Sequence, residues 1–350
     1  MKKAALLMLA AVVCFAGTAA AEEGGTTISN EKISVEVPEE IQEICDIETG
    51  DDYISFYEKI SHESFGGGYV GGIYLYENVE DYGNAPSYRR GGEIDYPDGS
   101  KLDIVLMMPS DVQYDLSDSE STENYRTLGK AFDEIASDIT VLGDGTFVPQ
   151  DQVDTTSIYN DILDRLISDL NEKKDRDALE ADGFSYVYAY SYDLEDRDVL
   201  DEIGYAFVDV NLDGYKELVI GSVEAPFIYD MFAPVDGQAV HVFSGGERSS
   251  YALSGNSPEN FMEICNQASG GAALSEITYS ILMSNRSELT EQVRFIYDAA
   301  ADEENPWFVN YGFDEENEPL SEDEWNQRMK NFGETLDLGF QPLSSFGSAE

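Results

Sequence analysis

Basic residues are scarce in this chain of 350 residues. Lysine and arginine together number 20, against 71 aspartates and glutamates, and the formal net charge at pH 7 is -51. An acidic excess of this size repels phosphate backbones, which argues against nucleic acids as partners. It disfavours anionic lipid surfaces for the same reason. The charge instead favours solubility and attracts cations.

Histidine and tryptophan are equally scarce. The two histidines, His62 and His241, are too few for a zinc or iron site built on imidazole ligands. The two tryptophans, Trp307 and Trp325, argue mildly against a surface that stacks sugars, although 22 tyrosines could replace them. Trp325 is better explained as a core residue, because Leu320 can pack against it as a hydrophobic staple at the start of a helix.

Cysteine is limited to three residues, of which Cys14 lies in an apolar leader. Ser257 and Pro258 predict the start of a helix that would carry Cys265 on its apolar stripe. The sequence leaves two states open for Cys45 and Cys265, namely buried free thiols or a disulfide, which an exported protein could form. A catalytic cysteine is disfavoured, because no histidine is placed recognisably to activate it.

Long apolar runs are confined to the first residues. Lys2 and Lys3 precede the apolar segment 4–17, and Ala19 to Ala21 supply small residues at a signal peptidase site. We expect residues 1–21 to be a signal peptide of bacterial type, and the mature protein to be secreted. No other run has the length of a membrane span, so we expect no transmembrane segment in the mature chain.

The first half of the mature chain, residues 26–140, is mostly strand-like. Segments 32–37, 53–60, 72–77 and 101–108 are rich in β-branched and aromatic residues, and Pro97 to Ser100 predict a hairpin turn. One amphipathic helix closes this half, because Leu128, Phe132 and Ile135 recur at helical spacing. Residues 141–153 are polar, contain glycine and proline, and predict a linker.

The second half, residues 154–348, opens with a long amphipathic helix whose apolar residues begin at Ile158. Several strand-like segments follow, and Tyr188, Tyr190 and Tyr192 alternate as on a strand. Ser321 and Glu324 predict a capping box at the start of a last helix. We therefore expect an α+β fold with two domains, each a mainly antiparallel sheet packed with one or more helices.

One motif carries chemistry, the segment D-x-N-x-D-G-x-x-E at 209–217. Calcium takes about six to eight oxygen ligands, and alternate oxygen-bearing side chains supply them in a tight loop. Glycine at the sixth position, Gly214, allows the sharp turn. The sequence therefore predicts a calcium site with these ligands: Asp209, Asn211, Asp213, the carbonyl of Tyr215, and Glu217.

The motif is not a complete EF-hand. An EF-hand has a bidentate glutamate at position twelve, where this chain has Ile220, and the segment that follows reads as a strand. The unit strand–loop–strand resembles the loops of integrin-type FG-GAP modules, with Glu217 where aspartate is usual. Those propellers repeat the loop in each blade, whereas this chain has one copy, so the propeller is not implied. An acidic hairpin without metal is the alternative.

A broader resemblance rests on local patterns along the chain. Segments 54–59, 66–68, 109–115 and 217–221 are similar to those of exported two-domain proteins of gut Firmicutes, whose function is largely unknown. The resemblance implies secretion, two domains and a single calcium loop. It implies no activity.

Other motifs lack the context that their chemistry needs. Gly66 to Gly71 match G-x-G-x-x-G, but a strand follows where a dinucleotide site needs a helix. His62-Glu63 lacks the second histidine of a zinc protease, and no serine hydrolase elbow or phosphate loop is present. A glycosidase needs one pair of carboxylates, and this chain offers too many to choose one.

The sequence favours a secreted, calcium-stabilised, non-enzymatic protein with a binding or cell-surface role. The alternative is an exported hydrolase that uses acidic residues, and a third is a purely structural module. The sequence does not identify the partner, whether another protein or a cell-surface molecule. It also does not define the oligomeric state or whether calcium is structural or regulatory.

Overall fold

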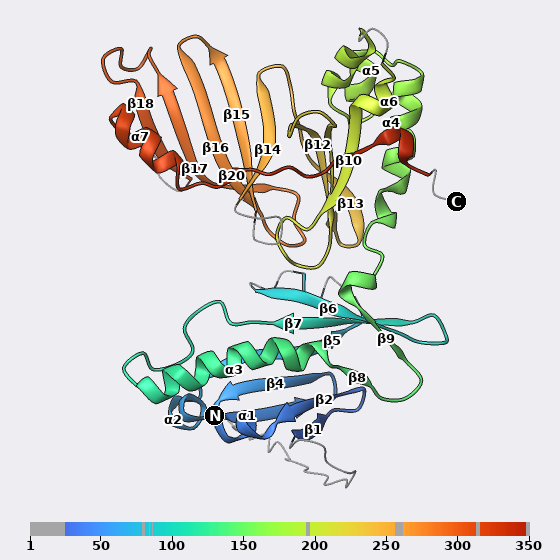
Figure 1. The fold of residues 1–350 in the computed structure, drawn as a ribbon, viewed down its shortest axis with the longest axis vertical. Helices are drawn as coiled ribbons and strands as arrows, with labels where there is room; N and C mark the ends of the chain where they lie inside the picture. Colours follow the sequence, from blue (N-terminus) through green and yellow to red (C-terminus); the bar gives the residue numbers. More distant parts are fainter. Residues whose placement is uncertain are drawn as a thin grey trace, which may run out of the picture. The chain divides into compact units, whose positions relative to one another are not determined.

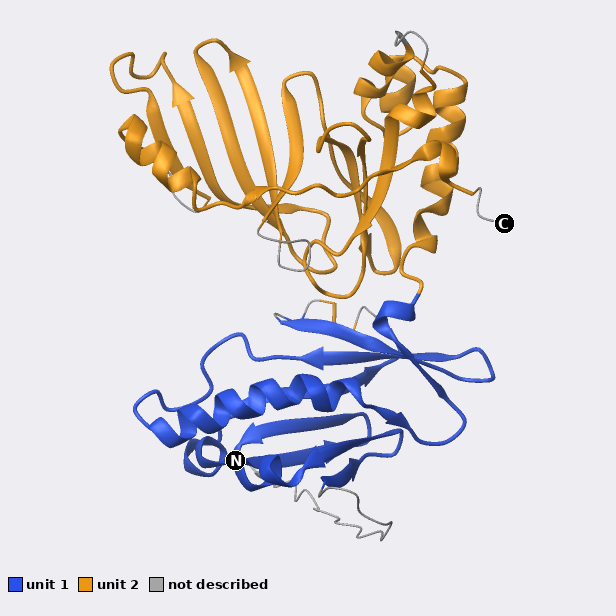
Figure 2. Ribbon diagram, in the orientation of Figure 1, with its two compact units in different colours: residues 1–78, 85–153 blue, residues 79–84, 154–350 orange. Residues whose placement is uncertain are grey.

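The computed structural model describes residues 25–78, 81–83, 85, 87–193, 197–255, 262–312 and 316–347. The chain forms two compact units (Figure 2). Unit 1 comprises residues 1–78 and 85–153, and unit 2 comprises residues 79–84 and 154–350. The predicted signal peptide lies outside the described residues. Among the helices that the structure describes, none combines the length and apolar character that crossing a membrane needs.

The protein is β-rich. Strands account for 41% and helices for 26%, and the strands form three sheets with antiparallel pairing. The predicted α+β class is therefore wrong. One cause is the segment around Cys265, whose apolar residues suit a helix or a strand equally. It forms strand β15 (Glu263–Gly271), in which Ile264 and Cys265 are both buried.

Unit 1 contains two sheets and one long helix. The three-stranded sheet has the order β1-β2-β8, with β1 at Gly25–Ser29, β2 at Ile33–Pro38 and β8 at Thr140–Val141. The six-stranded sheet has the order β3-β4-β5-β7-β6-β9. Its strands are β3 (Cys45–Gly50), β4 (Tyr53–Glu58), β5 (Tyr69–Tyr76), β6 (Tyr88–Asp95), β7 (Lys101–Met107) and β9 (Thr146–Pro149). The helices of unit 1 are α1 (Glu39–Ile44), α2 (Lys59–Phe65) and α3 (Ser119–Ser137).

Helix α3 covers one face of the larger sheet of unit 1 (Figure 1). Asp118 caps its start by accepting hydrogen bonds from the amides of Glu120 and Ser121. Phe132 packs edge-on against Phe56 with ring centroids 5.6 Å apart. A Cβ atom at Gly71 would lie 2.8 Å from the Phe132 ring, so glycine is what lets the helix approach the sheet.

The predicted linker at 141–153 is largely part of unit 1. Strand β9 pairs with β6, with Pro149 opposite Gly92 at one end and Thr146 opposite Asp95 at the other. A short 3₁₀ turn, η2 (Gln150–Gln152), follows β9. Polar composition and glycine suggested a loop, but β9 occupies a sheet edge, where few apolar residues are needed. Unit 2 begins after residue 153.

Unit 2 is built on one 12-stranded sheet with the order β19-β18-β17-β16-β15-β14-β12-β11-β10-β21, to which β13 and β20 add. Its first strands are β10 (Ile203–Val208), β11 (Glu217–Ser222), β12 (Ile228–Val235), β13 (Gln238–Ser244) and β14 (Ser249–Gly255). Beyond β15 follow β16 (Leu274–Leu282), β17 (Leu289–Asp298), β18 (Trp307–Tyr311), β19 (Glu318–Pro319), β20 (Glu334–Thr335) and β21 (Gln341–Pro342).

The helices of unit 2 gather at the two ends of this sheet (Figure 1). Near β10 lie η3 (Ser157–Tyr159), α4 (Asn160–Asn171), α5 (Arg176–Ala181), η4 (Tyr186–Asp193), α6 (Val199–Glu202) and η5 (Leu343–Ser345). Helix α4 buries Leu163, Leu166 and Leu170 completely. At the other end, the predicted capping box of Ser321 and Glu324 starts α7 (Glu322–Met329).

Two further local predictions have definite outcomes. The alternating Tyr188, Tyr190 and Tyr192 lie in the 3₁₀ segment η4 and not on a strand, and Tyr188 is fully buried. Cys45 and Cys265 are buried free thiols. Burial raises the pKa of the Cys45 thiol to about 12 and also raises the pKa of Cys265, so neither is a ready nucleophile at neutral pH.

Candidate functional site

The predicted calcium loop joins two paired strands of unit 2. Strand β10 ends at Val208, strand β11 begins at Glu217, and these two residues are the last pair of the antiparallel ladder. The loop between them therefore closes a hairpin. Four of the five predicted ligands lie within it and Glu217 lies at its end, so the expected order of strand, loop and strand is confirmed.

Two residues of the loop have left-handed backbone conformations. Leu212 has a φ of 59° and Gly214 a φ of 93°. Glycine adopts such a conformation without cost, as the motif predicted for its sixth position. Leucine adopts it with strain, and its side chain stays exposed. The loop is tight because the chain turns twice within these few residues.

The oxygen-bearing side chains of the loop fold back over its backbone. The two carboxylate oxygens of Asp209 accept hydrogen bonds from the amides of Asp213 at 3.1 Å and Gly214 at 3.0 Å. Asn211 Oδ1 also accepts from the amide of Asp213, at 3.1 Å, and Asp213 Oδ1 accepts from the amide of Tyr215 at 2.8 Å. These bonds hold three predicted ligands on the inner side of one turn.

Glu217 ties the two ends of the loop together. Its Oε2 accepts a hydrogen bond from the amide of Val210 at 2.9 Å, and Asn211 Nδ2 lies 3.4 Å from its Oε1. The residue is 1% exposed although it carries a carboxylate. Val210 is itself completely buried, and its carbonyl accepts from the amide of Met262 at 3.2 Å.

Burial gives the carboxyl groups of this loop unusual proton affinities. Asp213 is 2% exposed, and loss of solvation, reinforced by the charge of Asp209, raises its pKa to about 7. Burial and the neighbouring Asp213 raise the pKa of Glu217 well above its ordinary value. Burial also raises the pKa of Asp209. Because the charges of Asp209 and Asp213 both raise the proton affinity of Glu217, the three occupy one poorly solvated volume.

The chemistry of the set fits calcium better than it fits a softer metal. Its donors are all oxygen atoms, from carboxylates, an amide and a backbone carbonyl. Within the part of the chain that the structure describes, however, histidine, cysteine, aspartate and glutamate side chains do not gather in threes around a metal position. The loop carboxylates instead accept hydrogen bonds from backbone amides of their own turn. The feature of these carboxylates that bears on cation binding is their burial, with backbone amides as the hydrogen-bond donors.

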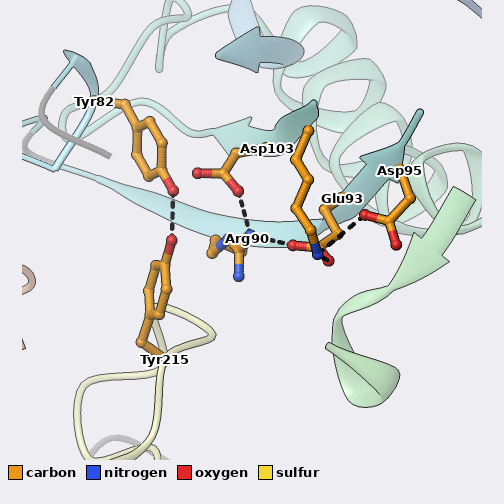
Figure 3. A network of polar contacts seen from close by, with 7 residues as sticks. Tyr82, Arg90, Glu93, Asp95, Asp103 and Tyr215 are labelled. Atoms are coloured by element: carbon orange, nitrogen blue, oxygen red, sulfur yellow. Dashed lines mark hydrogen bonds and ion pairs between the residues drawn. The ribbon is translucent and has the colours of Figure 1, made fainter. Parts of the chain in front are cut away.

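Tyr159 and Tyr82 form hydrogen bonds to the loop, and neither contact was predicted. The hydroxyl of Tyr159, which is completely buried, donates to the carbonyl of Lys216 at 2.9 Å. The hydroxyl of Tyr215 is 2.9 Å from that of Tyr82, which unit 2 also contains (Figure 3). Both partners lie more than fifty positions away in sequence. No local pattern marks such contacts.

A second polar cluster of unit 2 surrounds Asp230, which is completely buried. Its Oδ2 accepts from the amide of Ser185 at 2.9 Å, while His241 Nε2 and Ser244 Oγ both contact its Oδ1. His241 and Ser244 line a cavity of about 470 Å³. This cluster was not predicted, because Ser185, strand β12 with Asp230, and strand β13 with His241 and Ser244 meet only in the folded sheet.

The cluster at Asp230 does not have the arrangement of a hydrolytic triad. His241 Nε2 lies 3.2 Å from Asp230 Oδ1 and 3.0 Å from Ser244 Oγ, so one ring nitrogen serves both neighbours. A triad needs the two partners on opposite ring nitrogens. The amides of Gly245 and Gly246 donate to the carbonyls of Tyr229 and Ser249, so neither is free to hold an oxyanion.

Unit 1 contains an ion network between strands β6 and β7 (Figure 3). Glu93 and Asp103 are directly paired across the two strands, which would set two like charges side by side. Arg90, whose side chain is 3% exposed, contacts both, at 3.4 Å in the case of Glu93. Lys101 adds contacts to Glu93 and, at 3.1 Å, to Asp95. The network stabilises strand pairing and offers no reactive group.

The sequence matches no family model, no curated protein and no solved structure. The resemblance to exported proteins of gut Firmicutes therefore remains a prediction.

Proposed function

We propose that this chain is an exported, calcium-stabilised protein with a non-enzymatic role in binding or at a cell surface. The observation that carries the calcium part is the burial of Asp213 and Glu217, which are 2% and 1% exposed. Among the described residues, these two carboxylates accept hydrogen bonds from amides, and no ion pair with lysine or arginine joins either of them. A buried carboxylate that has amide donors but no opposite charge beside it is still costly, and a bound cation lowers that cost.

The affinity for calcium should be that of an extracellular module. Ile220 stands where an EF-hand has its bidentate glutamate, so the strongest ligand of a sensor site is missing. Dissociation constants on the order of 10⁻⁴ to 10⁻³ M are expected for such sites. At a hundredfold excess of free calcium over the dissociation constant, binding stabilises the native state by about 2.7 kcal/mol.

Thermal melting of the mature chain tests this proposal. We expect the melting temperature to rise with calcium and to fall in chelator. Asp213→Ala should remove the calcium effect, because it deletes a ligand. Asp302→Ala removes the same charge from a loop where the carboxylate accepts only from the amides of Glu304 and Asn305, and it should keep the effect.

Sodium chloride at matched ionic strength is a necessary control, since screening also relieves repulsion in so acidic a chain. The site assignment is wrong if sodium reproduces the whole calcium-dependent shift. It is equally wrong if the Asp213→Ala protein retains that shift.

One observation favours the alternative of an exported hydrolase. The pKa of Asp213, raised to about 7, and the carboxyl of Glu217 beside it resemble a general acid–base pair. Both groups are almost inaccessible, however, so a substrate could reach them only if the loop opened. The hydrolase alternative predicts turnover of an ester, peptide or glycoside. That activity should be independent of calcium and should be lost in Glu217→Gln.

A further inference from the structure

Three tyrosines lie on the same face of strands β4 and β5 in unit 1. Tyr53 and Tyr74 are direct cross-strand partners, and Tyr76 is two residues further along β5. Because side chains alternate along a strand, Tyr74 and Tyr76 share a face. The intervening residues point to the core that α3 covers: Ile54, Ile73 and Leu75. We call Tyr53, Tyr74 and Tyr76 the tyrosine strip.

Two rings of the tyrosine strip, those of Tyr53 and Tyr74, lie along the sheet above glycines. A Cβ atom at Gly50 would be 2.3 Å from Cε1 of Tyr53, and a Cβ atom at Gly72 would be 2.5 Å from Cε2 of Tyr74. Each ring therefore occupies the space in which another residue would place its side chain. Tyr74 is also held by a hydrogen bond of 3.0 Å between its hydroxyl and Ser55 Oγ.

The three rings are nearly parallel. The planes of Tyr53 and Tyr74 differ by 20° with centroids 5.5 Å apart, and those of Tyr74 and Tyr76 differ by 18° with centroids 6.3 Å apart. All three residues are half-buried, as rings with one face covered should be. An aromatic ring above a glycine can serve strand pairing alone, but that role does not require three rings with a common orientation.

Acceptors for hydrogen bonds surround the tyrosine strip. Glu48 is the cross-strand partner of Ser55, so it lies on the same face, and its side chain is 51% exposed. Asp52, the residue before Tyr53, has a side chain that is 63% exposed, and its Oδ1 lies 4.0 Å from Lys32 Nζ. Flat aromatic surface with carboxylates at its margin is suited to a sugar ring, whose apolar face can stack while its hydroxyl groups donate to the carboxylates.

We propose that the tyrosine strip binds a neutral polysaccharide. The net charge of -51 disfavours anionic glycans. Rings that lie along the sheet leave no groove between upright aromatic side chains, which a proline-rich peptide would need. The inference names the chemical class of partner for the proposed binding role, and it does not depend on the calcium loop, which belongs to unit 2.

Affinity electrophoresis of the mature chain in gels that contain a soluble neutral glycan tests the proposal. The probes are amylopectin, mixed-linkage β-glucan and xyloglucan, and polygalacturonate and a proline-rich peptide serve as comparisons. We expect retardation by at least one neutral glycan, in calcium and in chelator at a temperature where the protein is folded. Loss of retardation in chelator with the fold intact would contradict independence from the calcium loop.

The first variant removes rings. Tyr53→Ala combined with Tyr74→Ala should weaken retardation about thirtyfold, since each of the two stacked rings contributes on the order of 1 kcal/mol. Tyr190→Ala removes an exposed ring of unit 2 and should leave retardation unchanged. Tyr74→Phe keeps the ring and should retain most of the binding.

The second variant keeps every tyrosine and changes only ring orientation. In Gly50→Ala the new methyl group meets the Tyr53 ring, so the ring must tilt away from the sheet and retardation should fall. Gly129→Ala is the matched control in α3, where the new methyl group meets only Val70 at 4.0 Å. This pair remains informative if the double alanine variant does not fold.

Three results would overturn the proposal. They are the absence of retardation by every neutral glycan, retardation that the ring-removing and ring-tilting variants leave unchanged, and binding confined to polygalacturonate or to the proline-rich peptide. The calcium proposal would survive each of them, because its readout is the melting temperature with and without calcium.

Discussion

The amide of Val210 donates to Glu217 Oε2 at 2.9 Å, which joins the second residue of the loop to the first residue of strand β11. Glu217 therefore fixes the hairpin whether or not a cation is bound. It is also a predicted ligand whose raised pKa reflects burial beside Asp213. The side chain that shapes the loop is thus the one that most needs a compensating charge.

Glu217→Gln should separate these two roles. The amide oxygen of glutamine can still accept from Val210, so we expect the chelator-treated protein to be as stable as the parent or more stable, because a buried charge is gone. Calcium affinity should fall about tenfold or more, since a charged ligand is lost. Calorimetric titration and melting in chelator measure the two effects. A variant with parental calcium affinity would remove Glu217 from the ligand set.

Stability without calcium should depend on pH through Asp213. Its pKa is raised from 3.8 to about 7 in the folded protein, so between these values the native state binds more protons than the unfolded state. Stability of the chelator-treated protein should therefore decrease as the pH rises from about 4 to about 7, by up to a few kcal/mol. Calcium should remove most of the decrease.

Asp213→Asn is the control for that pH dependence. It keeps a side-chain oxygen for the amide of Tyr215 but cannot ionise. The difference in melting temperature between pH 5 and pH 7.5, measured in chelator, should be smaller in this variant than in the parent. Equal differences in both proteins would assign the pH dependence to other carboxyl groups.

Tyr159→Phe should loosen the loop from the side of helix α4. It removes the hydrogen bond to the carbonyl of Lys216 and leaves that carbonyl without this donor. We expect a loss of about 1 kcal/mol in the free energy of unfolding, measured with urea, and weaker calcium binding. Tyr190→Phe, which changes a hydroxyl at the surface, should have little effect on either quantity.

Export predicts a defined mature terminus. Lys2, Lys3 and the small residues at Ala19 to Ala21 predict cleavage before Glu22. Mass spectrometry of protein from the medium of an expressing bacterial culture should find a chain that begins near this residue. Recovery of protein that still begins at Met1 or Lys2 would contradict the cleavage site.

The hairpin loop at 209–217 could be predicted because its motif lies within nine consecutive positions, so spacing alone defines the turn. Calcium binding by this loop stays a prediction. The fold class could not be predicted, because strand pairing joins distant segments. The apolar pattern around Cys265 suits a helix or a strand, and only pairing with β14 and β16 selects the strand. The tyrosine strip was missed for the same reason, since Gly50 reaches Tyr53 across two strands.

The last residues of unit 2 also set the order in which that unit can assemble. Strand β20 pairs with β14, β21 pairs with β10, and Leu343 is 1% exposed in the core that α4 covers. Strand β10 pairs with β11 on one side, and its other edge lacks a partner until residues more than 130 positions later have been synthesised. An exported chain would cross the membrane with this edge open, so unit 2 should complete its folding only after its final segment has emerged.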